Sequence, residues 1–147
     1  MRRALSLSLI AALLTAGCAS VPTSDPRDDR QAKRFEPPAQ DKGALYVYRQ
    51  GWMGFVKPVE VGIVGGANAQ LASNTYLRLE GPPGPIEIGC RSGGSSSSRQ
   101  FEIVTGETRY VQVAMHPGLW GASCSVDEAS PDQGQAAVRA GERVDAL

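Results

Sequence analysis

The sequence predicts a mainly β fold, an antiparallel sandwich of about seven strands with a short C-terminal helix. Two observations support this prediction. From Gly43 onward, short runs with apolar residues at alternating positions recur about every ten residues, and glycine and proline separate them. No long apolar period of a helix appears in this region before Ser130.

The expected strands occupy 44–48, 59–63, 75–80, 85–91, 99–104, 108–115 and 122–126, with a further short one near 70–72. The run 44–48 is apolar on both faces, which is typical of a strand covered on both sides. The run 59–63 alternates, so we expect one buried face. The turns fall at 81–84 and 105–107. Glycines and serines at 93–98 predict a flexible hairpin loop.

The C-terminal helix is predicted from its start signals. Ser130 is an N-cap residue, Pro131 takes the first helical position, and Gln133 completes a capping box. The helix should end near Gly141. Because its apolar residues are mostly alanines and Gly134 weakens it, we expect loose packing.

The first 17 residues have the layout of an export signal. Arg2 and Arg3 precede an apolar stretch that ends at Leu14. Eleven helical residues rise roughly 16 Å, about half of a hydrocarbon core, so this stretch is too short to span a membrane. We therefore expect 1–17 to be a cleaved signal peptide.

The residues Leu14-Thr15-Ala16-Gly17-Cys18 resemble the bacterial lipobox, in which small residues precede a cysteine whose thiol is lipidated. The resemblance implies that Cys18 becomes a lipid-bearing N-terminus and that its acyl chains, palmitate among them, anchor the chain to a membrane. The alternative is a free or disulfide-bonded Cys18 in an ordinary secreted protein. Ala19 follows in place of an aspartate, which by analogy favours the outer membrane, with the protein facing the periplasm.

Residues 18–42 are polar, charged and rich in proline. Such a segment buries too little apolar surface to order itself, so we expect a flexible tether. Residues 43–147 then form the sandwich domain with its C-terminal helix.

The charge balance argues against nucleic acid as a partner. The chain has 15 basic and 15 acidic residues. Loss of Arg2 and Arg3 with the signal leaves a net charge of about −2, which does not suit the neutralisation of phosphates.

Cys90 and Cys124 are expected to form a disulfide. In 85–91, Cys90 shares a face with Ile86 and Ile88, and in 122–126 Cys124 shares one with Val126, so both thiols should point into the core. An exported chain meets an oxidising compartment. The alternative is two small core residues kept apart. By the same parity, Arg49 should point inward and pair with a carboxylate, Glu80 or Asp127.

Two family resemblances follow from these motifs. Ala44-Leu45-Tyr46-Val47-Tyr48-Arg49, a paired strand, a Gly-Pro turn and a C-terminal helix resemble an uncharacterised domain family of small bacterial lipoproteins. The segments 59–62, 79–88 and 104–108 are similar to PEGA-type sandwich domains, although the Pro-Glu-Gly-Ala opening is missing. Both resemblances imply a fold, and neither implies a catalytic residue.

The sequence offers no convincing catalytic, metal or cofactor site. His116 is the single histidine and follows a strand, and no G-x-S-x-G elbow is present. The strand glutamates are expected to face solvent, with no sign that two converge as a working acid and base. They are Glu60, Glu80, Glu87 and Glu102.

Two expected loops place apolar residues beside glycines. The loop after the first strand carries Trp52, Met53 and Phe55, and the loop before the last strand carries Leu119 and Trp120. These side chains either anchor a partner or fold back to cap the sandwich, and we favour capping.

The sequence thus predicts a lipid-anchored, non-enzymatic binding or envelope-structure module. Its expected partners are the membrane, through Cys18, and an envelope protein or cell-wall component. Two alternatives stay open: a small cell-wall-directed hydrolase and a carrier of apolar ligands.

Overall fold

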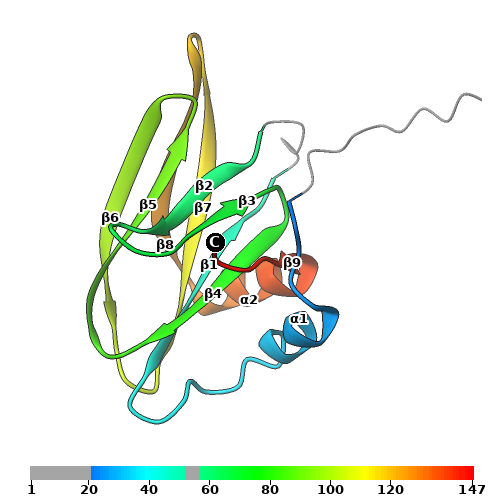
Figure 1. Cartoon of the computed structure of the whole chain (residues 1–147), viewed down its shortest axis with the longest axis vertical. Coiled ribbons are helices and arrows are strands. Elements are labelled where there is room, and N and C mark those ends of the chain that lie inside the picture. The colour runs from blue at the N-terminus through cyan, green and yellow to red at the C-terminus, as the bar shows by residue number, and fades with distance from the viewer. Residues whose placement is uncertain (1–20, 52–56) are drawn as a thin grey trace, which may run out of the picture.

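Two β-sheets face each other in the computed structural model, which describes residues 21–51 and 57–147. The five-stranded sheet has the order β8-β7-β1-β4-β9, and the four-stranded sheet has the order β3-β2-β5-β6 (Figure 1). The predicted sandwich is confirmed. The strands are β1 (Gly43–Arg49), β2 (Val59–Ile63), β3 (Asn68–Leu71), β4 (Thr75–Gly81), β5 (Gly84–Ser92), β6 (Ser95–Ile103), β7 (Thr108–Gly118), β8 (Gly121–Ala129) and β9 (Glu142–Arg143).

The pairing differs in one respect from the expected all-antiparallel sandwich. β1 and β7 run parallel, and so do β4 and β9. The chain leaves β1, passes through β2 and β3 in the other sheet, returns for β4, and crosses again for β5 and β6 before it reaches β7. These crossings bring β7 back to the end of the sheet where β1 starts. Alternation along a strand carries no information on such a crossing.

The serine run belongs to a strand and not to the expected loop. Ser95 opens β6 and pairs with Ser92, so the turn consists of Gly93 and Gly94 alone. Both glycines have positive φ, 54° and 86°. Positive φ at both positions is the conformation of a type I′ turn, which is common in two-residue hairpins, and glycine adopts it without a steric penalty.

Aliphatic side chains from the two inner faces fill the sandwich. The most deeply buried include Leu45, Val47, Val59, Leu71, Ile88, Val111 and Val113, each with an exposed fraction of 0%. They alternate with outward residues along each strand, as the sequence pattern predicts. The space between the sheets is thus occupied by packed side chains.

A second apolar cluster lies on the outer face of the five-stranded sheet. Tyr46, Tyr76 and Tyr110 pack there against the helices α1 (Pro26–Ala32) and α2 (Pro131–Ala140). The rings of Tyr46 and Tyr110 stack with their centroids 5.4 Å apart. Figure 1 shows both helices on the side away from β5 and β6. The molecule therefore has three layers: helices, five-stranded sheet and four-stranded sheet.

Helix α2 begins and ends where the sequence predicts. Ser130 is the N-cap residue of a complete capping box with Gln133, and Gly141 is the C-cap residue. The expected loose packing is wrong, because Val138 is fully buried in the cluster. Gly134 explains the close fit, since a Cβ atom there would lie 2.1 Å from Cγ of Tyr110.

The expected flexible tether is packed on the domain over residues 21–42. Asp25 caps α1, and the Tyr46 hydroxyl donates a hydrogen bond of 2.7 Å to the carbonyl of Ala32, the last residue of that helix. Phe35 packs beside the tyrosines. The segment is ordered because it covers an aromatic face that the rest of the chain leaves open, and composition alone does not reveal this role.

Candidate functional site

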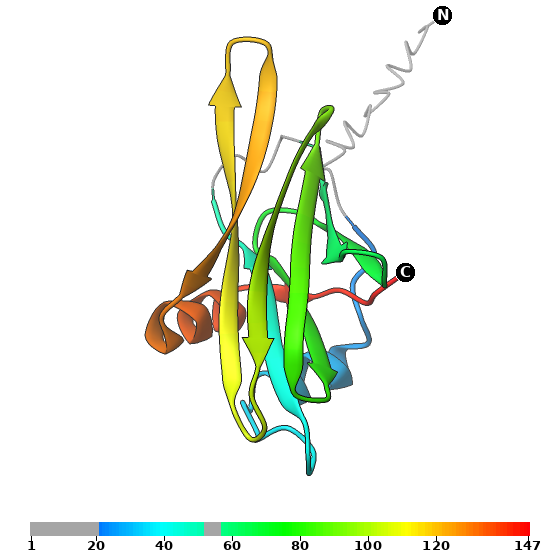
Figure 2. The same ribbon diagram turned by 90° about the vertical axis from the view of Figure 1, so that its left-hand side faces the viewer.

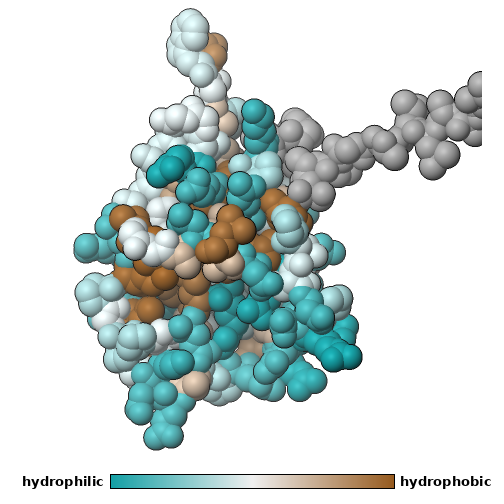
Figure 3. Space-filling view, in the orientation of Figure 1, coloured by the Kyte–Doolittle hydropathy of each residue, from teal (hydrophilic) through white to brown (hydrophobic). Residues whose placement is uncertain are grey.

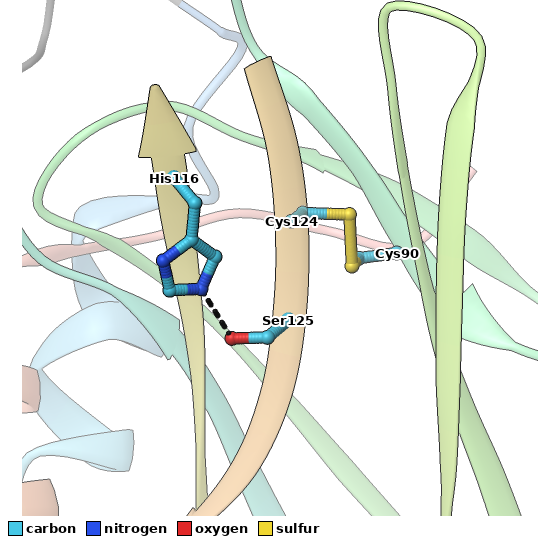
Figure 4. Close-up of a disulfide and its surroundings, with 4 residues drawn as sticks. All are labelled: Cys90, His116, Cys124 and Ser125. Carbon is cyan, nitrogen blue, oxygen red and sulfur yellow. Dashed lines mark hydrogen bonds between the residues drawn. A yellow bond between two sulfur atoms is a disulfide. The ribbon is translucent and has the colours of Figure 1, made fainter. Parts of the chain in front are cut away.

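A disulfide joins the two sheets. Cys90 of β5 and Cys124 of β8 are bonded, with their Cα atoms 6.2 Å apart, as strand parity predicts. Cys124 pairs with Met115 across the β7–β8 hairpin, so the bridge holds the outer half of that hairpin to the four-stranded sheet (Figure 4). Structural disulfides of this kind are typical of exported proteins.

The β7–β8 hairpin projects from one end of the sandwich (Figures 1 and 2). Its turn consists of Leu119 and Trp120 between the paired Gly118 and Gly121. Leu119 is 92% exposed and Trp120 is 97% exposed. The expectation that these residues cap the sandwich is therefore wrong. A two-residue turn at the end of a long hairpin cannot fold back to the core.

The other apolar loop, with Trp52, Met53 and Phe55, lies outside the described residues. In the space-filling view, the hairpin tip stands clear of the body and has hydrophobic surface at its end (Figure 3). The exposed pair Leu119 and Trp120 is called the apolar tip below.

His116 lies near the apolar tip and contacts a serine. Its Nε2 atom is 2.8 Å from the Oγ atom of Ser125 on the neighbouring strand (Figure 4). Both residues are on the outer face of the sheet, and His116 is exposed. A serine nucleophile also needs a group that orients the histidine and donors for an oxyanion. The acid nearest along β8 is Asp127, whose carboxylate is bound to Arg99 at 3.1 Å.

The strand glutamates are distributed over two surfaces. Glu80 lies on the outer face of the five-stranded sheet, where it pairs with Arg78 at 2.7 Å. A hydrogen bond from the backbone N–H of Ala39 lowers the pKa of Glu80 below its ordinary value, and Arg78 acts in the same direction. Glu60 and Glu87 lie on the four-stranded sheet and contact Arg91 and Ser98 respectively. Glu102 is exposed on the same sheet.

Arg49 is buried, as parity predicts, but its partners differ from the prediction. The side chain is inside the sandwich with 2% exposed, and it donates to the carbonyl oxygens of Leu71 at 2.9 Å and Lys57 at 3.5 Å. The expected carboxylate partners, Glu80 and Asp127, pair elsewhere. Burial lowers the pKa of Arg49. Backbone carbonyls at the ends of strands thus satisfy a charge that we expected a carboxylate to balance.

Asp29 fastens helix α1 to the sheet. Its carboxylate accepts hydrogen bonds from Lys33 at 2.7 Å, from the Tyr76 hydroxyl at 2.9 Å and from the backbone N–H of Arg143 at 2.9 Å. Burial alone would raise the pKa of Asp29, but these three hydrogen bonds outweigh burial and lower the pKa. Burial and the neighbouring Asp29 raise the pKa of Tyr76.

Two open surface grooves have polar linings. One, of about 360 Å³, crosses the outer face of β2, β5 and β6 and contains the Glu60–Arg91 pair and Ser96 to Ser98. The other, of about 420 Å³, lies between α1 and β4 and contains Arg78 and Arg143 together with two glutamates. Because positive and negative side chains balance in both grooves, neither groove clearly favours an ionic ligand.

Residues 21–51 and 57–147 contain neither a membrane-spanning helix nor a cluster of metal ligands. The two helices of this part, α1 and α2, are both too short to span a bilayer. No three histidine, cysteine, aspartate or glutamate residues of this part gather as metal ligands would.

Comparisons with known proteins add a distant relative. No family model matches the chain. The chain is similar to an uncharacterised protein of Haemophilus influenzae, with 22% identity over 127 residues that cover 86% of this chain and 76% of that protein. The similarity covers most of the chain and assigns no activity.

Proposed function

We propose that this chain is a bacterial lipoprotein, anchored through Cys18, whose sandwich domain serves in the periplasm as a non-enzymatic binding or envelope-structure module. The observation that carries the proposal is the sequence Leu14 to Cys18 directly behind a short apolar run. It resembles a lipidation site and lies where an export signal would end.

The cysteine pairing supports this proposal. The chain has three cysteines, and Cys90 and Cys124 are bonded to each other. Cys18 is therefore the odd cysteine and has no partner within its own chain. An odd cysteine in an exported protein suggests a role outside the chain's own disulfide, and lipidation is such a role.

The test is metabolic labelling with an alkyne-bearing fatty acid, carried out in a bacterium that expresses the protein. The wild type should incorporate the label, and Cys18→Ser should not, because a hydroxyl is a much poorer nucleophile than a thiol. Ser20→Ala is the matched control and should label like the wild type. Equal labelling of the Cys18→Ser variant would contradict the proposal.

The proposed outer-membrane location has a separate test. Ala19→Asp should move the protein to the inner-membrane fraction in a bacterium that retains lipoproteins with aspartate at this position. An unchanged distribution would count against sorting by Ala19 and would leave lipidation itself intact.

A second candidate function is a small cell-wall-directed hydrolase, which the His116–Ser125 contact of 2.8 Å favours. A fluorophosphonate probe tests it directly, since an activated serine reacts with the probe. Labelling that disappears in Ser125→Ala and His116→Ala, but persists in Ser123→Ala, would support the hydrolase. We expect no labelling of the wild type.

A further inference from the structure

We propose that the apolar tip, Leu119 and Trp120, inserts into the lipid headgroup region of the membrane to which Cys18 is anchored. This inference rests on the proposed lipidation of Cys18. It assigns the tip a lipid surface as its partner and fixes which end of the domain faces the membrane.

The tip has the chemistry of a membrane-interface anchor. Trp120 combines a large apolar ring with an N–H donor, and such side chains concentrate at the boundary between headgroups and acyl chains. Leu119 supplies apolar surface beside it. Both side chains are almost completely exposed, at 97% and 92%, and no described part of the chain covers them.

The charge around the tip is compatible with anionic headgroups. No aspartate or glutamate occurs between residues 108 and 126. The part of the hairpin near the tip therefore brings no carboxylate to a surface that would repel it, and Asp127 and Glu128 lie at the far end of β8. His116, at the exposed end of β7, is the nearest titratable group on the hairpin.

The tip and the start of the described chain lie at the same end of the five-stranded sheet. β1 and β7 run parallel, and the last β1–β7 partners are Tyr48 and Gln112. β7 then continues to Gly118, roughly 20 Å further at the rise of a strand. Val21 lines a groove with residues 72–75, next to the end of β1, where Arg49 pairs with Thr75.

The packing of residues 21–42 places this end of the domain near the membrane. The backbone N–H of Ser24 donates to the carbonyl of Arg143 at 2.8 Å, and Val21 is buried. Only three peptide units separate Val21 from Cys18, so they span at most about 11 Å. A long flexible tether would have allowed the domain to sit far from the membrane, whereas this short connection limits its distance from the lipid.

The hairpin is rigid enough to hold its tip in place. The disulfide ties Cys124, three residue pairs from the turn, to the four-stranded sheet, and the ladder runs from Tyr110–Ala129 to Gly118–Gly121. The turn between β5 and β6 lies beside the β7–β8 hairpin and extends as far as Ala122. A Cβ atom built on Gly93 of that turn would be 3.6 Å from the carbonyl oxygen of Ala122. The tip stands beyond that turn (Figure 2).

The test measures the depth of Trp120 in the full-length lipidated protein. The chain has two tryptophans, so Trp52→Phe leaves Trp120 as the sole emitter. This variant is reconstituted into vesicles of phosphatidylethanolamine and phosphatidylglycerol that carry bromine at different acyl positions. Bromine close to the headgroups should quench Trp120 strongly. Transfer of the ring from water into the headgroup region should also shift its emission to the blue.

The matched control carries Trp52→Phe, Trp120→Phe and Thr105→Trp. Thr105 is exposed in the turn before β7, at the opposite end of the strand from the tip. Its tryptophan should be quenched several-fold less. Equal quenching of the two variants would overturn the inference. A blue shift of Trp120 without bromine quenching would also overturn it, because a protein partner or a second copy would then cover the tip.

Failure of the anchor itself has a different signature. If the wild type incorporates no fatty acid, the proposed function fails whatever the tip does. If the protein is lipidated and floats with the vesicles but its tip is not quenched, the proposed function stands and only this inference is wrong. Thermal melts of each variant show whether it is folded, and Trp120→Phe should melt like the wild type because the ring is exposed.

Discussion

At the residue scale, the sequence and the structure give Gly134 different roles. The sequence marks it as a weak point of the C-terminal helix, because glycine disfavours helices. In the structure it is the point of closest approach between α2 and the sheet, where the ring of Tyr110 occupies the space of a side chain. The glycine is needed for packing, although it costs helix propensity.

Gly134→Ala should therefore destabilise the protein. The alanine gains about 1 kcal/mol in helix propensity. Overpacking against Tyr110 should outweigh this gain and lower the free energy of unfolding by about 1–3 kcal/mol. Urea unfolding measures the difference. In the control, Gly81→Ala, the new Cβ atom would meet only Cδ1 of Ile103 at 3.6 Å, so stability should stay close to that of the wild type. An alanine at 134 that stabilises the protein would refute the packing argument.

Arg49 marks the limit of prediction from strand parity. Alternation along β1 predicts its burial, and the structure confirms this. Its partners are backbone carbonyls of Leu71 and Lys57. Parity says which way a side chain points but not which strand ends lie opposite it, so the partner could not be predicted.

At the element scale, the strands that alternate most clearly were the easiest to predict. The run 59–63 coincides with β2, and Ser130 to Gly141 bound the C-terminal helix as expected. Helix α1 has local start signals, an N-cap at Asp25 followed by a proline, which the prediction of a tether overlooked. The other misses share a cause, because β9 and the parallel pairings depend on distant segments. Local patterns contain no trace of such contacts.

Asp29 should make the attachment of α1 sensitive to acid. The pKa of Asp29 is lowered in the folded protein. Its contribution to the free energy of unfolding is therefore complete above the ordinary aspartate pKa of about 3.9, and it declines as the pH falls through the pKa of the folded protein. At neutral pH, Asp29→Ala should lower the free energy of unfolding by about 1–3 kcal/mol, because three hydrogen bonds are lost. The difference from the wild type should shrink below about pH 4.

The local consequence is measurable with trypsin, which cuts after Lys33 and Arg34. At neutral pH, Asp29→Ala should be cut there faster than the wild type, because α1 loses its attachment to Tyr76 and Arg143. The control is Asp28→Ala, since the Asp28 side chain is exposed and, among the described residues, only its backbone carbonyl accepts a hydrogen bond from another side chain. Equal cleavage rates in all three proteins would show that Asp29 does not fasten the helix.

At the scale of the whole molecule, the segment 21–42 changes the expected arrangement most. Its polar, proline-rich composition predicts a flexible tether, yet it covers an aromatic face of the sheet. Composition measures how much a segment can bury by itself, but here the buried surface belongs to β1, β4 and β7. The disulfide, in contrast, was predictable, because parity places both thiols in the core.

The disulfide should contribute substantially to stability, since it links the two sheets. Replacing both Cys90 and Cys124 with alanine should lower the free energy of unfolding by about 2–4 kcal/mol. The double variant avoids an unpaired thiol. Reductant should lower the urea midpoint of the wild type and leave that of the double variant unchanged. A wild type that is insensitive to reductant in urea, or that shows two free thiols when denatured without reductant, would contradict the bridge.

The most direct test of the lipoprotein proposal is the mass of the N-terminal peptide of the mature protein isolated from bacterial membranes. We predict that this peptide begins at Cys18 and carries a diacylglyceryl group on the thiol, with a further acyl chain on the amine where the host adds one. An unmodified peptide that begins at Cys18, or a mature chain that begins at any other residue, would contradict the proposal.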